Sequence, residues 1–379
     1  MRKRFLMTPG PTPVPSEAAV EEAKPIIHHR TKEFRDIFST VMEDIKIPFK
    51  TKGDGYIFAS SGTGAMEGAV ANTLSRGDKA ICIMAGKFGE RWGEICKAFG
   101  VEVVPIQLEW GETCEPDLLS DTLKKNPDVK AVFTTLCETS TGTLFKIKEF
   151  GEIVKEKEDT ILVVDAISGL CADNIEVDAW HVDICVAASQ KGIMLPPGLA
   201  FFSISEKAWR FVEKSDLPKY YFDFKAYKKA FEKQGDTPYT PAVSLIRALR
   251  KSLDIIKSEG IDNVLRRHAL MAEATRRAIK ALGFELLSKY PANTCTAIKY
   301  KEGMGDDFRK HLLDKYGVQV AGGQSHLKGK IFRIAHLGYM EKPDIIYTIA
   351  AIEMALHDMG FDVEFGKGVA EAEKILKDL

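Results

Sequence analysis

TILVVDAISG, residues 160–169, and VDICVAASQKG, residues 182–192, carry the strongest structural signal in this chain. Each opens with an apolar run of strand length, and neither run alternates with polar residues as a half-exposed strand would. Strands that are apolar throughout are typical of a mainly parallel sheet that helices cover on both faces. The two segments therefore predict buried strands of an α/β domain.

Five further apolar runs of the same kind lie on either side of these two segments. Helical patterns, such as Ala65–Leu74, Glu90–Phe99 and Phe150–Lys157, separate most of the runs. Strands separated by helices are typical of βαβ units, so we predict a doubly wound domain with a mainly parallel seven-stranded sheet. The five runs are YIFA (56–59), KAICIM (79–84), VEVVPI (101–106), VKAVFTT (129–135) and LAFFSI (199–204).

The pattern changes after about Pro241, where long helical stretches and a few short strands replace the regular alternation. This mixture predicts a smaller α+β domain. The helical stretches cover residues 244–260, 262–283 and 344–360, and the short strand-like runs are TAIKY, VQVA and IFRIAH. We divide the chain into an N-terminal arm (1–20), a large domain (21–250) and a small C-terminal domain (251–379).

The balance of charges excludes several classes of partner. The 379 residues include 53 Lys and Arg against 54 Asp and Glu, which gives a formal net charge of −1 and a pI near 6.7. No long-range field attracts nucleic acid or an anionic membrane, so we expect small-molecule substrates. The N-terminus MRKRFLMTPGP has too short an apolar patch for a signal peptide, and no run approaches the ~18 apolar residues of a membrane helix. We therefore expect a cytoplasmic protein.

The cysteines and histidines indicate neither disulfides nor a metal site. The seven cysteines include no CxxC pair, and several lie inside apolar runs, so we expect reduced core residues. The eight histidines show no HxxxH or HExxH spacing, and we predict no structural metal. The chemistry of the chain should therefore rest on other residues.

Asp165 ends the apolar run of the first quoted segment, and Lys191 follows that of the second. Ligands of open α/β sheets bind outside the carboxyl ends of the strands, so both side chains should face one crevice. Pyridoxal 5′-phosphate (PLP) needs this pair, because a lysine amine forms an imine with its aldehyde and a carboxylate keeps its pyridine nitrogen protonated. Taken singly, Asp165 could equally cap a helix and Lys191 could be a solvated charge.

A third element, SSGTGAME (60–67), follows a predicted strand and opens a predicted helix. Unpaired N–H groups at a helix start bind phosphate, and Gly62 and Gly64 let the backbone come close. The segment lacks the lysine of GxxxxGK(S/T) and the spacing of GxGxxG, so it does not match the nucleotide fingerprints. It is either a phosphate-binding loop or an ordinary βα turn.

Six segments, taken in order, resemble the class V aminotransferases, and the nearest branch is that of the alanine–glyoxylate and serine–pyruvate aminotransferases. The similarity runs from TPGPTPVP (8–15) to about residue 360. It implies the PLP-transferase fold type I, PLP as the cofactor, and a homodimer with active sites at the subunit interface. The segments are SSGTGAME, KFGERW (87–92), CETSTGT (137–143), VVDAISG (163–169), SQKGIMLPPG (189–198) and GKIFRIAHLG (329–338).

The resemblance also implies how the cofactor is held. Phe88 would stack on the ring, although relatives often have Trp there, and offset stacking contributes about 0.5–1.5 kcal/mol beyond burial. Thr139 would bond the cofactor near its 3-hydroxyl unless it caps a helix, and Ile167 would pack on the ring face opposite Phe88 unless it is ordinary core. The phosphate would lie on Ser61, Gly62 and Thr63 with Gln190 beside it, Lys191 would form the internal aldimine, and Asp165 would bind the ring nitrogen.

The remaining implied residues concern the substrate and the neighbouring subunit. Arg333 lies in an apolar run, where a charge needs a partner. The family supplies the substrate's α-carboxylate, and an internal salt bridge is the alternative. Gly10, in TPGP (8–11), would border the substrate pocket, unless this segment is a rigid surface turn. Tyr239 or Thr240, in TPYTPAVSL (237–245), would reach the partner's phosphate site, and Thr240 could instead cap a helix.

The predicted activity is transamination of alanine or serine with glyoxylate or pyruvate, in a ping-pong cycle with Lys191 as general base at Cα. Other PLP reactions remain open, namely transamination of aspartate or an aminophosphonate, or a lyase or decarboxylase reaction. A cysteine desulfurase is disfavoured, because the last cysteine is Cys295, in the short run NTCTAIKY. From other classes, a non-catalytic PLP-fold subunit of a larger complex and a nucleotide-binding module remain. Arg30 is the candidate for a second carboxylate site.

Overall fold

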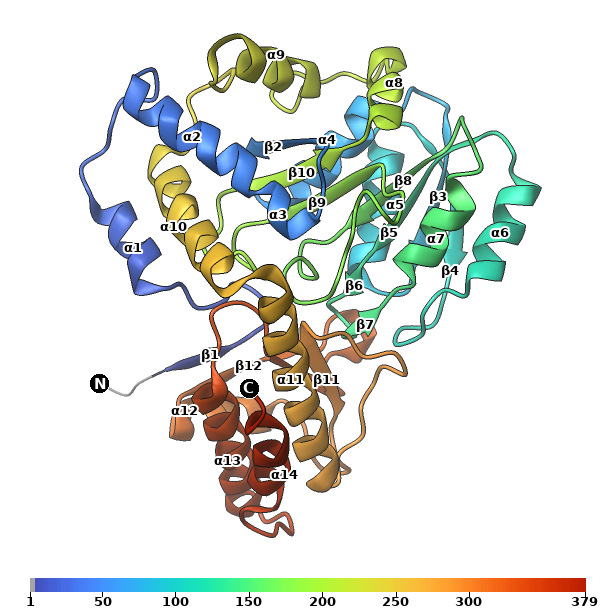
Figure 1. Cartoon of the computed structure of the whole chain (residues 1–379). Coiled ribbons are helices and arrows are strands. Elements are labelled where there is room, and N and C mark those ends of the chain that lie inside the picture. The colour runs from blue at the N-terminus through green and yellow to red at the C-terminus, as the bar shows by residue number, and fades with distance from the viewer. Residues whose placement is uncertain (1–3) are drawn as a thin grey trace.

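A seven-stranded, mainly parallel sheet forms the centre of the computed structural model, which describes residues 4–379 (Figure 1). Its strand order is β2-β10-β9-β8-β5-β3-β4, and only β10 runs antiparallel to its neighbours. The seven runs predicted from the sequence are its seven strands, which confirms the predicted fold. They are β2 (Asp54–Phe58), β3 (Lys79–Met84), β4 (Glu102–Gln107), β5 (Val129–Thr135), β8 (Ile161–Asp165), β9 (Ile184–Ala188) and β10 (Ala200–Ile204).

Helices cover both faces of this sheet (Figure 1). Two of them, α4 (Gly62–Thr73) and α5 (Lys87–Ala98), begin directly after β2 and β3 and pack on the strands. Small residues let α4 lie close to the sheet, since a Cβ on Gly68 would lie 3.0 Å from the Phe58 ring. The others around this sheet are α1 (Ser16–Ala23), α2 (Lys32–Asp44), α3 (Lys46–Phe49), α6 (Pro116–Lys125), α7 (Ile147–Val154), α8 (Glu206–Lys214), α9 (Phe224–Gln234) and α10 (Val243–Glu259).

A second, four-stranded sheet lies with four helices at one end of the molecule (Figure 1). Its order is β1-β12-β13-β11, and β1 (Phe5–Met7) runs parallel to β12. The N-terminal arm therefore contributes a strand to a sheet made otherwise of residues after 290. The other members are β11 (Cys295–Lys299), β12 (Val318–Gly322), β13 (Ile331–Ala335), α11 (Ile261–Ala281), α12 (Asp307–Tyr316), α13 (Lys342–Asp358) and α14 (Lys367–Leu376). A short hairpin, β6 (Cys137–Glu138) with β7 (Thr143–Leu144), and a 3₁₀ turn, η1 (Ser325–Leu327), complete the elements.

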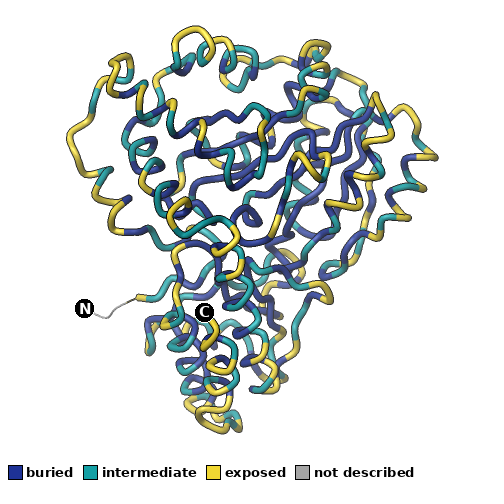
Figure 2. Tube along the Cα trace, viewed as in Figure 1, coloured by how far each residue is buried: buried dark blue, intermediate teal, exposed yellow. Residues whose placement is uncertain are grey.

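Each sheet has its own apolar core, and burial is concentrated along the central strands (Figure 2). Helix α11 belongs to both cores, because Val264 packs in the first and Met271 in the second. The predicted division into an arm, a large and a small domain stays a prediction, and residues 1–3 of the arm lie outside the described residues. All seven cysteines are buried and unpaired. None of the helices within residues 4–379 has the length and apolar character that crossing a bilayer requires.

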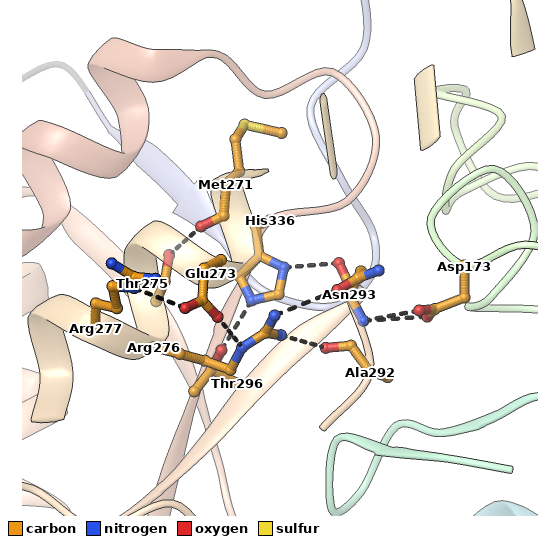
Figure 3. A network of polar contacts seen from close by, with 10 residues as sticks. All are labelled: Asp173, Met271, Glu273, Thr275, Arg276, Arg277, Ala292, Asn293, Thr296 and His336. Carbon is orange, nitrogen blue, oxygen red and sulfur yellow. Dashed lines mark hydrogen bonds and ion pairs between the residues drawn. The ribbon is translucent and has the colours of Figure 1, made fainter. Parts of the chain in front are cut away.

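A buried polar network joins the two parts (Figure 3). Asp173, in the loop after β8, accepts the backbone N–H of Asn293 on both carboxylate oxygens, at 3.0 and 3.2 Å. Arg276 of α11 donates to the carbonyl of Ala292, and His336 uses both ring nitrogens, on the Asn293 carbonyl and the Thr296 hydroxyl. These bonds fix the second sheet against the loops at the carboxyl ends of the first.

Candidate active site

Asp165 and Lys191 lie at the carboxyl ends of adjacent parallel strands, since Asp165 ends β8 and Lys191 follows β9 by three residues. Asp165 is 4% exposed, and its Oδ1 accepts a 2.7 Å hydrogen bond from the backbone N–H of Ile167. Burial raises the pKa of Asp165 to about 7 and lowers the pKa of the Lys191 amine, although the two charges attract each other. The structure thus brings together the predicted acid and amine, each held toward its neutral form.

The N-terminal arm closes over the amine. Lys191 Nζ donates a 2.5 Å hydrogen bond to the carbonyl of Pro9, and Thr12 bonds the carbonyls of Gln190 and Lys191. Gly10 has φ +134°, and a Cβ at this position would lie 2.2 Å from Lys191 Nζ. A φ in this range strains any residue other than glycine, and Gly10 lies beside the Lys191 amine, while its role at a substrate pocket stays a prediction.

The predicted phosphate loop lies at the start of α4. Ser61 is the N-cap residue, but its side chain does not cap the helix, and a Cβ on Gly62 would lie 2.5 Å from Ile167 Cδ1. The loop therefore contacts the segment that follows Asp165. Gln190 Oε1 is buried without a hydrogen-bond partner among the described residues. A helix start whose N–H groups have no side-chain cap can donate to an anion, and a buried oxygen without a partner can accept a hydrogen bond from a ligand.

A buried carboxylate, Glu138, anchors the segment that carries Phe88. Glu138 is fully buried, and it accepts hydrogen bonds from the N–H groups of Phe88 (3.0 Å) and Gly89 (2.9 Å) at the start of α5. It also accepts the backbone N–H and the hydroxyl of Ser140. Phe88 is half-buried, and the Arg91 guanidinium carbon lies 4.9 Å from its ring centroid. Phe88 is therefore held at its backbone and from one side of its ring.

Arg333, in β13, is 6% exposed and has no carboxylate within 4 Å among residues 4–379. Its Nε and Nη2 donate to the Gly322 carbonyl at 3.1 and 2.7 Å, and its Nη1 donates to the Thr139 carbonyl at 2.8 Å. The internal salt bridge considered above is thus absent. Carbonyl oxygens do not neutralise the guanidinium, so its positive charge can still pair with an anionic ligand.

Three other predicted residues have clear surroundings. The Thr139 hydroxyl donates to Ser168 Oγ at 2.6 Å and caps no helix. Tyr239 stacks on Tyr221 with ring centroids 5.3 Å apart, and Thr240 is exposed and does not cap α10. No hydrogen bond or ring contact joins Tyr239 or Thr240 to Lys191 or Asp165 within the described chain. Direct contacts join Gly10 to Lys191, Gly62 to Ile167 and Thr139 to Arg333, whereas no hydrogen bond or ring contact joins Tyr239 or Thr240 to these residues in the described chain.

Two residues at the site are not among those predicted from the sequence. Arg91 donates from Nη1 to the Thr63 hydroxyl at 3.2 Å, and Glu138 links the start of α5 to Ser140, the residue after Thr139. Arg91 could have been found from spacing, because it lies three residues after Phe88 and so on the same face of the helix. Glu138 gives a weaker signal, an acid inside the otherwise uncharged run CETSTGT.

Several relatives align in sequence with nearly the whole of this chain. An aminotransferase of Methanocaldococcus jannaschii described as uncharacterized is 44% identical over 99% of this chain and 98% of its own. The soluble hydrogenase 42 kDa subunit of Anabaena cylindrica is 40% identical over 99% of both chains. The serine–glyoxylate aminotransferase of Methylorubrum extorquens is 35% identical over 99% of this chain and 96% of its own.

The fold agrees with a solved structure as well. The ureidoglycine–glyoxylate aminotransferase of Bacillus subtilis superposes with a TM-score of 0.95 at 26% identity, covering 100% of this chain and 99% of that one. The family model for class-V aminotransferases matches residues 16–339. The amine, the acid, the uncapped helix start and the unpaired arginine thus occur in a chain of this family's sequence and fold. The chain belongs to the class V aminotransferases and is a PLP-dependent enzyme of fold type I.

Proposed function

We propose that this aminotransferase transfers the amino group of alanine or serine to glyoxylate or pyruvate. The observation that carries the proposal is Arg333, a buried guanidinium that has no acid partner in the described chain and holds only the carbonyls of Gly322 and Thr139. An α-carboxylate common to amino acids and 2-oxo acids supplies the missing negative charge. Glyoxylate as acceptor is supported by two of the proteins compared above, whose names include it.

A second carboxylate site is not supported by Arg30. Its Nη1 lies 2.7 Å from the buried Asp236 carboxylate and donates to the Thr237 carbonyl. Because its charge is already compensated, Arg30 has little to offer the distal carboxylate of a dicarboxylic substrate. This favours a small monocarboxylic donor over aspartate.

The residues present fit PLP. Gln190 Oε1 is buried and unpaired, the N–H groups at the start of α4 have no side-chain cap, and Asp165 Oδ2 accepts no hydrogen bond within residues 4–379. The α4 N–H groups could donate to a phosphate, and Asp165 Oδ2 could accept a hydrogen bond from a protonated ring nitrogen. We propose that Ser61, Gly62, Thr63 and Gln190 hold the phosphate, that Asp165 holds the ring nitrogen, and that Phe88, Ile167 and Thr139 surround the ring.

PLP, when bound, supplies an aldehyde that condenses with amines and a ring that accepts electrons. Lys191 would then bind the cofactor and, once displaced by the substrate amine, move the proton from Cα. Its lowered pKa suits this role, because the amine must be unprotonated to accept a proton. Asp165 would hold a proton at the ring nitrogen, and Arg333 would orient the substrate by its carboxylate. Gly10 and Pro9 would exclude water on the side of the arm.

We propose a homodimer in which Tyr239 or Thr240 of each subunit reaches the other's phosphate site. Tyr220 is 79% exposed and lies with Tyr221 and Tyr239 in one aromatic group. Exposed aromatic groups of this kind are typical of interfaces. The cytoplasmic location stays a prediction.

A second candidate is a non-catalytic subunit of a larger assembly, which the name of the Anabaena cylindrica relative favours. The two candidates differ in whether the chain alone converts amino acids. A desulfurase remains disfavoured, because Cys295 is fully buried within β11 and cannot act as a mobile thiol.

The test is a half-reaction screen. The PLP-loaded protein is mixed with alanine, serine, aspartate or cysteine alone, and the cofactor's visible spectrum and the released 2-oxo acid are followed. We expect conversion by alanine or serine, slower conversion by aspartate, and weaker use of every donor by Arg333→Gln, by roughly 10- to 100-fold in kcat/KM. Arg277→Gln, which removes the same charge at the surface, is the matched control.

A spectrum that no amino acid changes would favour the non-catalytic subunit, and release of carbon dioxide without a pyridoxamine form would favour a decarboxylase. Equal activity of Arg333→Gln and Arg277→Gln would contradict the proposed role of Arg333 in binding the substrate carboxylate, on which the substrate class rests.

A further inference from the structure

The proposed phosphate site lacks a cation among its own donors. Ser61, Gly62, Thr63 and Gln190 are neutral, and so are Tyr239 and Thr240, the residues proposed to come from a partner subunit. A phosphate monoester carries about 1.5 to 2 negative charges at neutral pH. Helix α4 offers the partial charge of its dipole, about half an elementary charge. A nearby cation would supply the rest of the compensating charge.

Two of the three cations near the site are already engaged. Burial lowers the pKa of the Lys191 amine, which must also act as a base. Arg333 is held in β13 by the carbonyls of Gly322 and Thr139, where it waits for a substrate carboxylate. The third is Arg91, whose charge lowers the pKa of Asp165, although burial dominates that pKa and raises it.

Arg91 contacts the proposed phosphate loop through Thr63. It is half-buried, has no carboxylate within 4 Å in the described chain, and donates from Nη1 to Thr63 Oγ1 at 3.2 Å. A hydroxyl that accepts a hydrogen bond from a cation becomes a stronger donor of its own proton. The contact therefore both brings a positive charge to the loop and turns the Thr63 hydroxyl into a better donor for an anion.

We propose that Arg91 is the counter-charge of the cofactor's phosphate and acts through the Thr63 hydroxyl. The proposal rests on the assignment of residues 61–63 as the phosphate loop. Arg91 also lies 4.9 Å from the Phe88 ring centroid, so its loss could weaken the ring site instead. The two roles differ in their ligand dependence, because only the first requires the phosphate.

The experiment compares PLP with pyridoxal, which has the same ring and aldehyde but no phosphate. Apo protein is titrated with each, and the dissociation constants come from the visible absorbance. For Arg91→Gln we expect PLP affinity to fall roughly 10- to 100-fold while pyridoxal affinity changes little. Arg91→Lys keeps the charge and should recover part of the loss. Lys97→Gln, an exposed site on the same helix, is the control for lost charge and should match the wild type.

Each result supports or overturns the proposal. An equal fall for both ligands assigns Arg91 to the Phe88 ring, and unchanged PLP affinity in Arg91→Gln removes its role altogether. If the wild type binds pyridoxal as tightly as PLP, the assignment of residues 61–63 as the phosphate loop is wrong. The half-reaction screen tests the substrates separately, so its result does not depend on this assignment. Thermal unfolding of each apo variant shows whether a loss of affinity is a loss of folded protein, and in that case the Arg91→Lys comparison decides.

Discussion

Asp165 ends β8 and Asp173 lies in the loop that follows this strand, yet the surroundings of the two buried carboxyls differ. Burial raises the pKa of each to about 7. Asp173 accepts the Asn293 N–H on both oxygens, in a network where His336 uses both ring nitrogens (Figure 3). Asp165 accepts one hydrogen bond, on Oδ1, and the charges near it include the Lys191 amine and Arg91, which has no carboxylate within 4 Å in the described chain.

A shifted pKa does not by itself identify a functional site. Both acids are buried, and burial accounts for both shifts. What separates them is unused hydrogen-bonding and charge capacity, which is present around Asp165 and largely consumed around Asp173. Buried polar groups without partners cost free energy in the free protein, so they are expected where a ligand satisfies them.

The largest expected effect comes from removing the amine opposite Asp165. Lys191→Ala should lower kcat by about 10⁴-fold, because it removes both the attachment of PLP and the base at Cα. Borohydride reduction followed by peptide mapping should label Lys191 in the wild type and no residue in the variant. A label on any other lysine of the wild type would end the assignment of this crevice as the active site.

The next effect uses the two acids as a matched pair. Asp165→Asn should lower kcat by on the order of 10²-fold or more, because an amide cannot hold a proton at the ring nitrogen. Asp173→Asn should leave kcat within about twofold and change only stability, since Asn still accepts the Asn293 N–H. Steady-state kinetics at saturating PLP measure both. The comparison fails if the two variants lose activity equally.

Most of the first sheet was predictable because its strands are buried on both faces and therefore apolar. Strands β3 (Lys79–Met84) and β5 (Val129–Thr135) have the predicted limits, and the other five differ by at most two residues at either end. Strand β1 was missed, because three residues carry no periodic signal and their partner β12 lies more than 300 residues away. Glu138 could not be assigned, because its donors at Phe88 and Gly89 are about 50 residues distant.

A smaller effect concerns the pH dependence of apo stability. A carboxyl whose folded pKa is raised from 3.8 to about 7 stabilises the fold below about pH 4, and this contribution is lost as pH rises to about 7. His268 and His336 act oppositely, since burial lowers their pKa to about 3 and stability rises with pH through about 3 to 6.5. The pH dependence of wild-type stability therefore combines the carboxyl and histidine contributions. A variant that removes one of the carboxyls separates them.

The apo form of Asp165→Asn should gain melting temperature relative to the wild type as pH rises from about 5 to 8, on the order of a few degrees. The gain arises because the wild type must ionise a buried carboxyl near Glu138, whereas Asn stays neutral. With saturating PLP, the wild type should melt at the higher temperature, because the protonated ring nitrogen then compensates the negative charge of Asp165. Differential scanning calorimetry of both forms provides the measurement, and a pH-independent difference would argue against an ionising Asp165.

The smallest effect tests whether the Phe88 ring contacts the cofactor or only packs in the protein core. Its backbone is fixed by Glu138, and its half-buried ring has Arg91 on one side. Phe88→Trp enlarges the stacking surface, and stacking contributes about 0.5–1.5 kcal/mol, so PLP should bind about two- to tenfold more tightly. Phe88→Leu keeps an apolar side chain without a π face and should bind PLP more weakly at similar apo stability. If PLP titration gives one affinity for all three proteins while their melting temperatures diverge, the Phe88 ring packs the core and the cofactor's ring lies elsewhere.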